Sequence, residues 1–144
     1  MILPYDNLLV QPMREELTAI GFKELLTPTD VDEFMAEESG TSLLVVNSVC
    51  GCAAGMARPG VRLALQQGPT PHRLATVFAG QDVEAVAQAR GYFSDYPPSS
   101  PSMALFRDGE LVHFVPRHRI EGRTAVEVAN DLVKALQEHC APAT

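Results

Sequence analysis

The sequence predicts an α/β fold in which a central mixed β-sheet carries helices on both faces. Through the first two thirds of the chain, short apolar runs alternate with amphipathic segments, a pattern typical of parallel strands joined by helices. The last third instead has two apolar runs around an Asp-Gly pair, which indicates an antiparallel hairpin. The 144 residues suit one domain, 1–144, with residues 1–20 as an N-terminal extension.

The first half should contribute two strands and their helices. We expect a short helix after Pro12 in the extension, and a weak strand over residues 21–26. Thr29 is placed to cap a helix that begins at Asp30. One face of that helix carries three apolar residues, Val31, Phe34 and Met35. The continuous apolar run 43–46 predicts a strand buried on both faces.

The middle of the chain continues the alternation. Residues 52–67 are rich in Ala, Met and Leu, so we expect a helix there, kinked or locally interrupted by Pro59. Residues 74–79 predict the next strand, and Asp82 can cap a helix that runs to about Arg90.

The last third predicts a hairpin and a closing helix. The apolar runs 103–106 and 111–115 flank a turn containing Asp108-Gly109. Thr124 and Glu127 fit a capping box. The helix that follows should bury a stripe formed by Val126, Ala129, Leu132, Val133 and Leu136. The resulting order, β-α-β-α-β-α-β-β-α, is the one expected of a thioredoxin-like three-layer sandwich.

Charge and composition exclude several functions. With 18 acidic and 11 basic side chains, the net charge of −7 repels phosphate backbones and anionic lipids, so we expect neither nucleic acid nor membrane as a partner. The N-terminal residues lack the pattern of a secretory signal, and every apolar run is too short to cross a bilayer. We therefore expect a cytoplasmic protein, in which three cysteines do not indicate structural disulfides.

The strongest candidate site is the Cys50-Gly51-Cys52 motif, which follows the buried apolar run and opens the next helix. Open α/β sheets place their sites at the carboxyl ends of strands. The positive end of a helix favours the thiolate, which is the nucleophilic form of cysteine. With one intervening residue, an oxidised pair should be strained, and Gly51 should relieve part of that strain.

Two other interpretations of the cysteine pair remain open. Both side chains could simply be small and buried, since cysteine is often buried. They could also form half of a metal site, completed from His72, His113, His118 or Cys140. Structural zinc usually needs four ligands, and no second pair at a diagnostic spacing is present, so we expect no bound metal. Redox chemistry is the interpretation that we favour.

Four further residues are candidate substrate contacts. Besides Gly51, the Ser100-Pro101 pair precedes a strand, and in a thioredoxin-like fold this proline would face the cysteines. A cis bond there would expose neighbouring backbone for pairing with an extended substrate. Arg58 could support a thiolate or bind a carboxylate of a thiol cofactor, although a solvated helix arginine is the simpler expectation.

Two weaker features complete the survey. A small basic run, His113 with residues 117–119, is expected to be a solvated loop rather than a site. Cys140 lies near the C-terminus and is expected to be an incidental thiol.

Several segments together resemble one protein family. Residues 47–60 read Asn-Ser-Val-Cys-Gly-Cys-Ala-Ala-Gly-Met-Ala-Arg-Pro-Gly, and 98–105 read Pro-Ser-Ser-Pro-Ser-Met-Ala-Leu. With 113–118 (His-Phe-Val-Pro-Arg-His) and 120–123 (Ile-Glu-Gly-Arg), these segments resemble the bacilliredoxins. The resemblance extends over almost the whole chain and includes the Cys-Gly-Cys motif without a departure.

The resemblance implies a thioredoxin fold and a thiol–disulfide oxidoreductase that removes bacillithiol from protein mixed disulfides. It implies that Cys50 attacks and Cys52 resolves. The small thiol bacillithiol would be a co-substrate, with no cofactor bound, and the protein partners would be bacillithiolated or disulfide-bearing clients. Two alternatives stay open: a general protein disulfide isomerase or oxidoreductase without a dedicated small thiol, and a non-enzymatic metal-binding module.

Overall fold

A computed structural model describes residues 7–140 of the chain as five strands in one mixed sheet, in the order β1-β3-β2-β4-β5. The strands are Lys23–Glu24 (β1), Thr41–Asn47 (β2), Arg73–Phe78 (β3), Ser102–Arg107 (β4) and Glu110–Val115 (β5). β1 and β2 run parallel to β3, whereas β4 is antiparallel to both β2 and β5. The predicted thioredoxin-like sandwich is confirmed, including the hairpin that closes its sheet.

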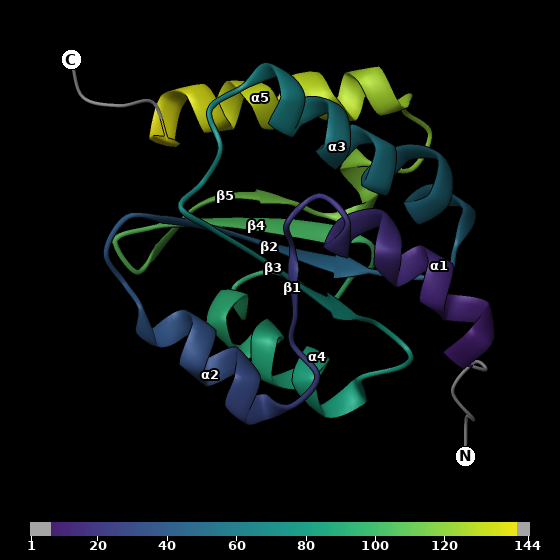
Figure 1. Cartoon of the computed structure of the whole chain (residues 1–144). Coiled ribbons are helices and arrows are strands. Elements are labelled where there is room, and N and C mark those ends of the chain that lie inside the picture. Colours follow the sequence, from purple (N-terminus) through teal and green to yellow (C-terminus); the bar gives the residue numbers. More distant parts are fainter. Residues whose placement is uncertain (1–6, 141–144) are drawn as a thin grey trace.

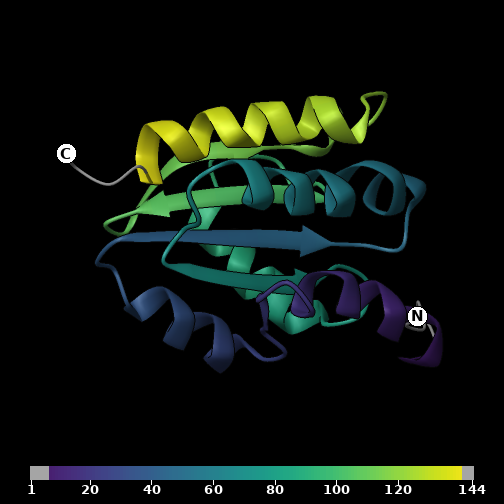
Figure 2. The same cartoon turned by 45° about the horizontal axis from the view of Figure 1, so that its top comes forward.

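Helices cover both faces of this sheet (Figures 1 and 2). On one face lie α3 (Arg58–Gln67) and α5 (Ala125–Cys140), and on the other lie α2 (Pro28–Ala36) and α4 (Val83–Arg90). The N-terminal helix α1 (Asn7–Thr18) lies beside the sheet at the end near β1 and β3. Among residues 7–140, none of the helices combines the length and the apolar character needed to cross a membrane.

The central strand β2 belongs to both halves of the core. Leu43 and Val45 point into the cluster under α3 and α5, whereas Leu44 and Val46 point into the cluster over α2 and α4. All four are at most 1% exposed, as expected of a parallel strand covered on both faces. Because both faces are fixed by burial, the register of β2, and with it the position of the motif at its end, is strongly specified.

Turn and cap chemistry confirms two local predictions. The β4–β5 turn places Asp108 and Gly109 at φ values of 50° and 84°, the left-handed region that Asp-Gly turns use. At the start of α5, Glu127 N–H donates to Thr124 Oγ1 and Thr124 N–H donates to a Glu127 carboxylate oxygen, which is the predicted capping box.

Two helix starts differ from prediction. The cap of α2 is Thr27, whose Oγ1 accepts the Asp30 N–H at 3.1 Å, because Pro28 suits the first helical position. Helix α1 contains Pro12 rather than following it, and at this interior position the proline removes one backbone hydrogen bond of the helix.

Two side chains take other roles than those predicted. Asp82 precedes α4 but makes no capping bond, because both of its carboxylate oxygens accept from the Arg14 guanidinium at 2.9 and 3.1 Å. Val126 is 58% exposed, so it does not belong to the buried stripe of α5. The stripe instead includes Val128 and Ala135, which shifts the buried face by part of a turn.

Strand directions bring three chain segments to one edge of the sheet. The carboxyl end of β2 is paired with the start of β4, with Val46 opposite Ser102. β5 runs antiparallel to β4, so its carboxyl end lies at the same edge. The residues that follow β2 and β5 and those that precede β4 therefore converge, and this edge holds the cysteine motif.

The contact between α3 and α5 gives a testable stability prediction. A Cβ at Gly60 would lie 2.7 Å from Val128 Cγ1 and 3.2 Å from the Ala125 carbonyl oxygen, closer than packed atoms approach. We expect Gly60→Ala to lower the free energy of unfolding by about 1–3 kcal/mol. Chemical denaturation followed by circular dichroism measures the change.

The matched control for that variant is Gly55→Ala, in the helical turns just before α3. A Cβ at Gly55 would meet nothing within 4 Å, so this variant should be neutral or slightly stabilising. Equal stability of the two variants would contradict the packing argument.

Candidate active site

The cysteine motif is a strand-to-helix turn. After β2 ends at Asn47, the chain turns through residues 48–50, and the Cys50 carbonyl accepts the first helical hydrogen bonds, from Ala53 and Ala54 N–H. A π-helical segment, Ala53–Ala57, leads into α3. This is the local interruption predicted from Pro59, which cannot donate the usual bond to the preceding turn.

The Cys50 sulfur is surrounded by hydrogen-bond donors. The Ser48 hydroxyl donates to Sγ at 3.2 Å, and its oxygen accepts the Cys50 N–H at 3.4 Å. Burial raises the pKa of Cys50, but hydrogen bonds from Ser48, from the backbone N–H groups of Ala53 and Cys52 and from the Cys52 side chain outweigh it. The net pKa of Cys50 is lower than that of an ordinary thiol.

Cys52 has the opposite environment, although it lies only two residues further on. The pKa of Cys52 is raised by burial, by the negative charge and hydrogen bond of Cys50, and by the charge of Glu121. Only the positive charge of Arg117 opposes them. With Cys50 ionised, Cys52 therefore stays a protonated thiol, and the two cysteines are chemically unequal.

Arg58 is buried beneath this turn and does not contact either sulfur. Its side chain is 3% exposed, and Nη1 donates to Asn47 Oδ1 at 2.9 Å and to the Ser48 carbonyl at 2.8 Å. Nε donates to Glu16 of α1 at 2.7 Å. The expectation of a solvated arginine is wrong, because every contact made by Arg58 holds the end of β2 against α1 and α3.

Arg117 is the cation that does reach the site, and sequence reasoning missed it. From the segment after β5, its Nη2 lies 3.9 Å from Cys52 Sγ and its Nη1 lies 3.5 Å from the Ser100 carbonyl oxygen. The Arg117 side chain is 43% exposed, as expected of a solvated run, but that expectation did not include its approach to Cys52. The signal that could have identified it is its position after the last strand, at the same edge as Cys50.

The other members of that run are dispersed. His113 is half-buried on β5, with its Nε2 at 3.9 Å from Asp131 of α5, whereas His118 and Arg119 are exposed. They do not form one site with Arg117.

The peptide bond between Ser100 and Pro101 is cis, the form considered from the sequence for a substrate-binding segment. It directly precedes β4, whose first residue, Ser102, is paired with Val46 at the end of β2. Pro101 is buried, Ser100 is half-buried, and the Ser99 hydroxyl accepts the Arg117 N–H at 3.2 Å. The loop before β4 is therefore held to the segment after β5 next to the cysteine turn.

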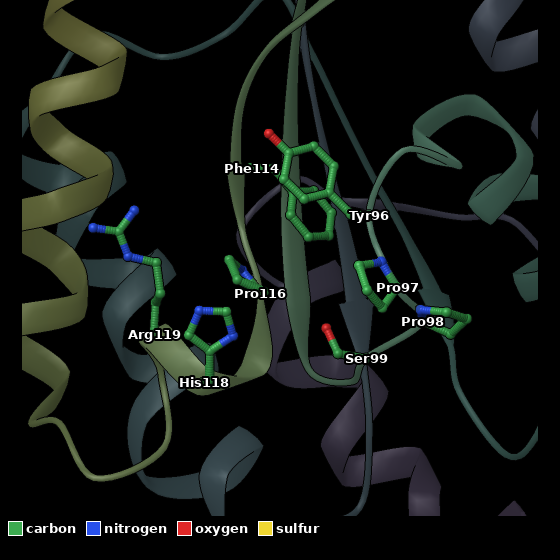
Figure 3. A pocket seen from close by; sticks show the side chains of 8 residues that line it. All are labelled: Tyr96, Pro97, Pro98, Ser99, Phe114, Pro116, His118 and Arg119. Atoms are coloured by element: carbon green, nitrogen blue, oxygen red, sulfur yellow. The ribbon is translucent and has the colours of Figure 1, made fainter.

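A cavity of about 310 Å³ lies between the same two segments (Figure 3). The Tyr96 ring stacks on Phe114 at a centroid distance of 4.4 Å. The remaining lining side chains are Pro97, Pro98, Ser99, Pro116, His118 and Arg119.

Two candidates remain, Gly51 between the two cysteines and Cys140 at the end of α5. Gly51 lies in the first helical turn and does not have a positive φ. A Cβ at this position would meet nothing within 4 Å. In this dithiol form, the site therefore does not use the conformational freedom of a glycine. Cys140 is near Thr41, at the opposite end of β2, and burial raises its pKa. Across residues 7–140, no three His, Cys, Asp or Glu side chains are grouped so as to hold a metal.

Comparison with solved structures shows the fold. The chain superimposes on a mutant thioredoxin of Halobacterium salinarum with a TM-score of 0.56 at 18% identity, covering 84% of this chain and 92% of that one. A Fasciola hepatica thioredoxin gives 0.55 at 17%, covering 82% and 99%. The fold and the unequal dithiol at the strand-to-helix turn define a thioredoxin-fold dithiol protein.

Sequence comparison gives the family. Residues 5–140 match the family described as Disulphide isomerase. A bacilliredoxin of Cytophaga hutchinsonii is 56% identical over 134 residues, covering 93% of this chain and 98% of its own, and one of Shouchella clausii is 54% identical over 136 residues, covering 94% of each. The chain belongs to the bacilliredoxin family.

The unequal pKa values predict an order of alkylation. At pH 7 a lower pKa means a larger thiolate fraction, so iodoacetamide should modify Cys50 faster than Cys52. Cys140, whose pKa burial raises, serves as the internal control and should also react slowly. Mass spectrometry of peptides after timed quenching gives the three rates. Equal rates at Cys50 and Cys52 would contradict the assigned environments.

The contacts of Arg58 predict a loss of stability. Arg58→Met leaves the Ser48 carbonyl buried without its donor and removes the partner of Glu16, so the free energy of unfolding should fall by about 2–4 kcal/mol. The exposed Arg62 of the same helix is the control, and Arg62→Met should stay within about 0.5 kcal/mol. Denaturant titrations measure both, and an unchanged Arg58→Met midpoint would refute the structural role.

Proposed function

We propose that this oxidoreductase removes bacillithiol from protein mixed disulfides, with Cys50 as the attacking and Cys52 as the resolving residue. The observation that carries the proposal is the environment of the two sulfurs. Hydrogen bonds to Cys50 lower its pKa, whereas its neighbour Cys52 remains a thiol until Cys50 has reacted. The curated relatives, named bacilliredoxins, support bacillithiol as the small thiol.

The reaction proceeds by two exchanges at sulfur. The Cys50 thiolate attacks the bacillithiol sulfur of the mixed disulfide, a Cys50–bacillithiol disulfide forms, and the client cysteine leaves as a thiolate that takes a proton from solvent. In one route, a second bacillithiol attacks the sulfur of the bound bacillithiol, which forms bacillithiol disulfide and frees the Cys50 thiolate. In the other route, Cys52 attacks Cys50 Sγ and displaces the bound bacillithiol. If Cys52 attacks, the product is a Cys50–Cys52 disulfide, which an external dithiol must reduce.

The surroundings of the motif suit a polypeptide client. Ser100 and Pro101 directly precede β4, whose first residue, Ser102, is paired with the end of β2, and we assign them, with Gly51, as contacts for the client backbone. Arg58 does not belong among these contacts, because its donors are engaged inside the fold. The proposed chemistry needs no bound cofactor and belongs in a reducing compartment such as the cytosol, where free thiols complete the exchange.

Disulfide isomerisation is a second candidate, because the family matched over residues 5–140 is described as Disulphide isomerase. The same Cys50 attack on a protein–protein disulfide would begin it. The two activities differ in whether the adduct on Cys50 is a small thiol or a protein.

The division of labour predicts distinct phenotypes for two variants. Cys50→Ser should abolish release of bacillithiol from a bacillithiolated client, because the low-pKa nucleophile is lost. Cys52→Ser should retain the first exchange and accumulate a stable adduct on Cys50. Intact-protein mass spectrometry, with parallel measurement of the released client thiol, follows both steps.

The adduct mass also separates the candidate substrates. Cys52→Ser is incubated with bacillithiolated, glutathionylated and plain-disulfide clients, with Cys140→Ser as the matched control for loss of an unrelated thiol. A preferred bacillithiol adduct supports the proposal, whereas a protein adduct favours isomerisation. Normal client release by Cys50→Ser together with an inert Cys52→Ser would reverse the assigned roles.

A further inference from the structure

We propose that Arg117 is a further catalytic residue, which stabilises the Cys52 thiolate during the resolving step. This inference rests on the proposed function in one respect, that Cys52 attacks a mixed disulfide held on Cys50. It does not depend on which thiol the mixed disulfide carries.

The geometry places the Arg117 charge directly at the second sulfur. Arg117 Nη2 is 3.9 Å from Cys52 Sγ, within the range of a hydrogen bond to sulfur. For Arg58, the arginine nearest in sequence to the motif, the donors contact Asn47, the Ser48 carbonyl and Glu16 instead. Arg117 is thus the arginine whose guanidinium contacts a reacting atom.

Three contacts hold Arg117 in this position. Its backbone N–H donates to Ser99 Oγ at 3.2 Å, and its Nη1 donates to the Ser100 carbonyl at 3.5 Å. Its Nε pairs with Glu121, four residues further along, at 3.0 Å. The Arg117 side chain therefore reaches from the segment after β5, past the residues before β4, to the cysteine turn.

The charges around Cys52 change during the reaction. In the free dithiol, burial opposes ionisation of Cys52 most strongly, the negative charges of Cys50 and Glu121 oppose it further, and the charge of Arg117 favours it. Once Cys50 is in a mixed disulfide, its sulfur carries no charge. The repulsion from Cys50 is then gone while the attraction from Arg117 remains, so Cys52 ionises more readily at the stage when it must attack.

The step assisted by Arg117 balances as a simple exchange. The Cys52 thiol releases its proton to solvent, its sulfur attacks Cys50 Sγ, and the bond between Cys50 and the bound thiol breaks. A Cys50–Cys52 disulfide forms, and the bound thiol leaves with the electron pair of the broken bond. The oxidising equivalents pass from the mixed disulfide to the cysteine pair.

A neutral probe isolates this step. In a Cys140→Ser background, 2,2′-dipyridyl disulfide is mixed with the reduced protein and thiopyridone release is followed by stopped flow. The first phase depends on probe concentration and reports attack by Cys50, and the second, independent of probe concentration, reports attack by Cys52. Because the probe and its leaving group are uncharged at neutral pH, they do not pair with Arg117.

We expect Arg117→Met to slow the second phase about fivefold at pH 7, the factor for one exposed charge pair near 4 Å. This loss should exceed any change in the first phase. Arg117→Lys, which keeps the charge, should restore part of the rate. Glu121→Gln removes the opposing charge and should accelerate the second phase. The pH at which the second phase reaches half its maximum should rise in Arg117→Met and fall in Glu121→Gln.

Two outcomes would overturn the proposal. One is a second-phase rate and pH profile unchanged in Arg117→Met. The other is equal slowing by the Met and Lys variants at all pH values, which would mean that Arg117 shapes the loop rather than supplying charge. Failure of the proposed function is recognised separately, in the assay with a bacillithiolated client, where Cys50→Ser would then release the client at the normal rate.

Discussion

The geometry of this site depends on the hydrogen bonds made by the buried guanidinium of Arg58. It donates to Asn47 and to the Ser48 carbonyl at the end of the central strand, and to Glu16 of the N-terminal helix. Three parts of the chain, β2, α1 and the helix that carries Arg58, are thereby fixed relative to one another. A buried charge is tolerated only with its partners in place, so the turn before the cysteines has little freedom to move.

The same network extends to the reactive sulfur through Asn47 and Ser48. Asn47 Oδ1 also accepts the Ser48 N–H at 2.9 Å, and Asn47 Nδ2 donates to the Met13 carbonyl at 3.1 Å. With its backbone held on both sides, Ser48 directs its hydroxyl to Cys50 Sγ. Arg58 therefore influences the nucleophile by positioning the group that hydrogen-bonds it. Because the Arg58 guanidinium already donates to three acceptors, it is not available to bind a carboxylate of a ligand.

The sequence could predict features that depend on local chemistry. The Asp108-Gly109 turn, the Thr124–Glu127 capping box and the cysteine motif at a strand end are each specified by neighbouring residues. Features decided by distant partners were not accessible. Nothing near Asp82 in the sequence indicates that its carboxylate accepts hydrogen bonds from Arg14, which lies 68 residues earlier. Arg117 lies 65 residues beyond Cys52 and reaches it only because β2, β4 and β5 are neighbours in the sheet.

The two cysteines occupy one helix start, so the partial charge of the helix cannot distinguish them. The distinction comes from groups outside the helix. Ser48, fixed from the strand side, donates to Cys50, whereas Glu121 and Arg117, from the segment after β5, act in opposite directions on Cys52. The difference in ionisation between the two cysteines of this motif thus arises from groups at two separate parts of the sheet edge. The strand side makes the first sulfur reactive, and the far side, through Glu121 and Arg117, governs the ionisation of the second.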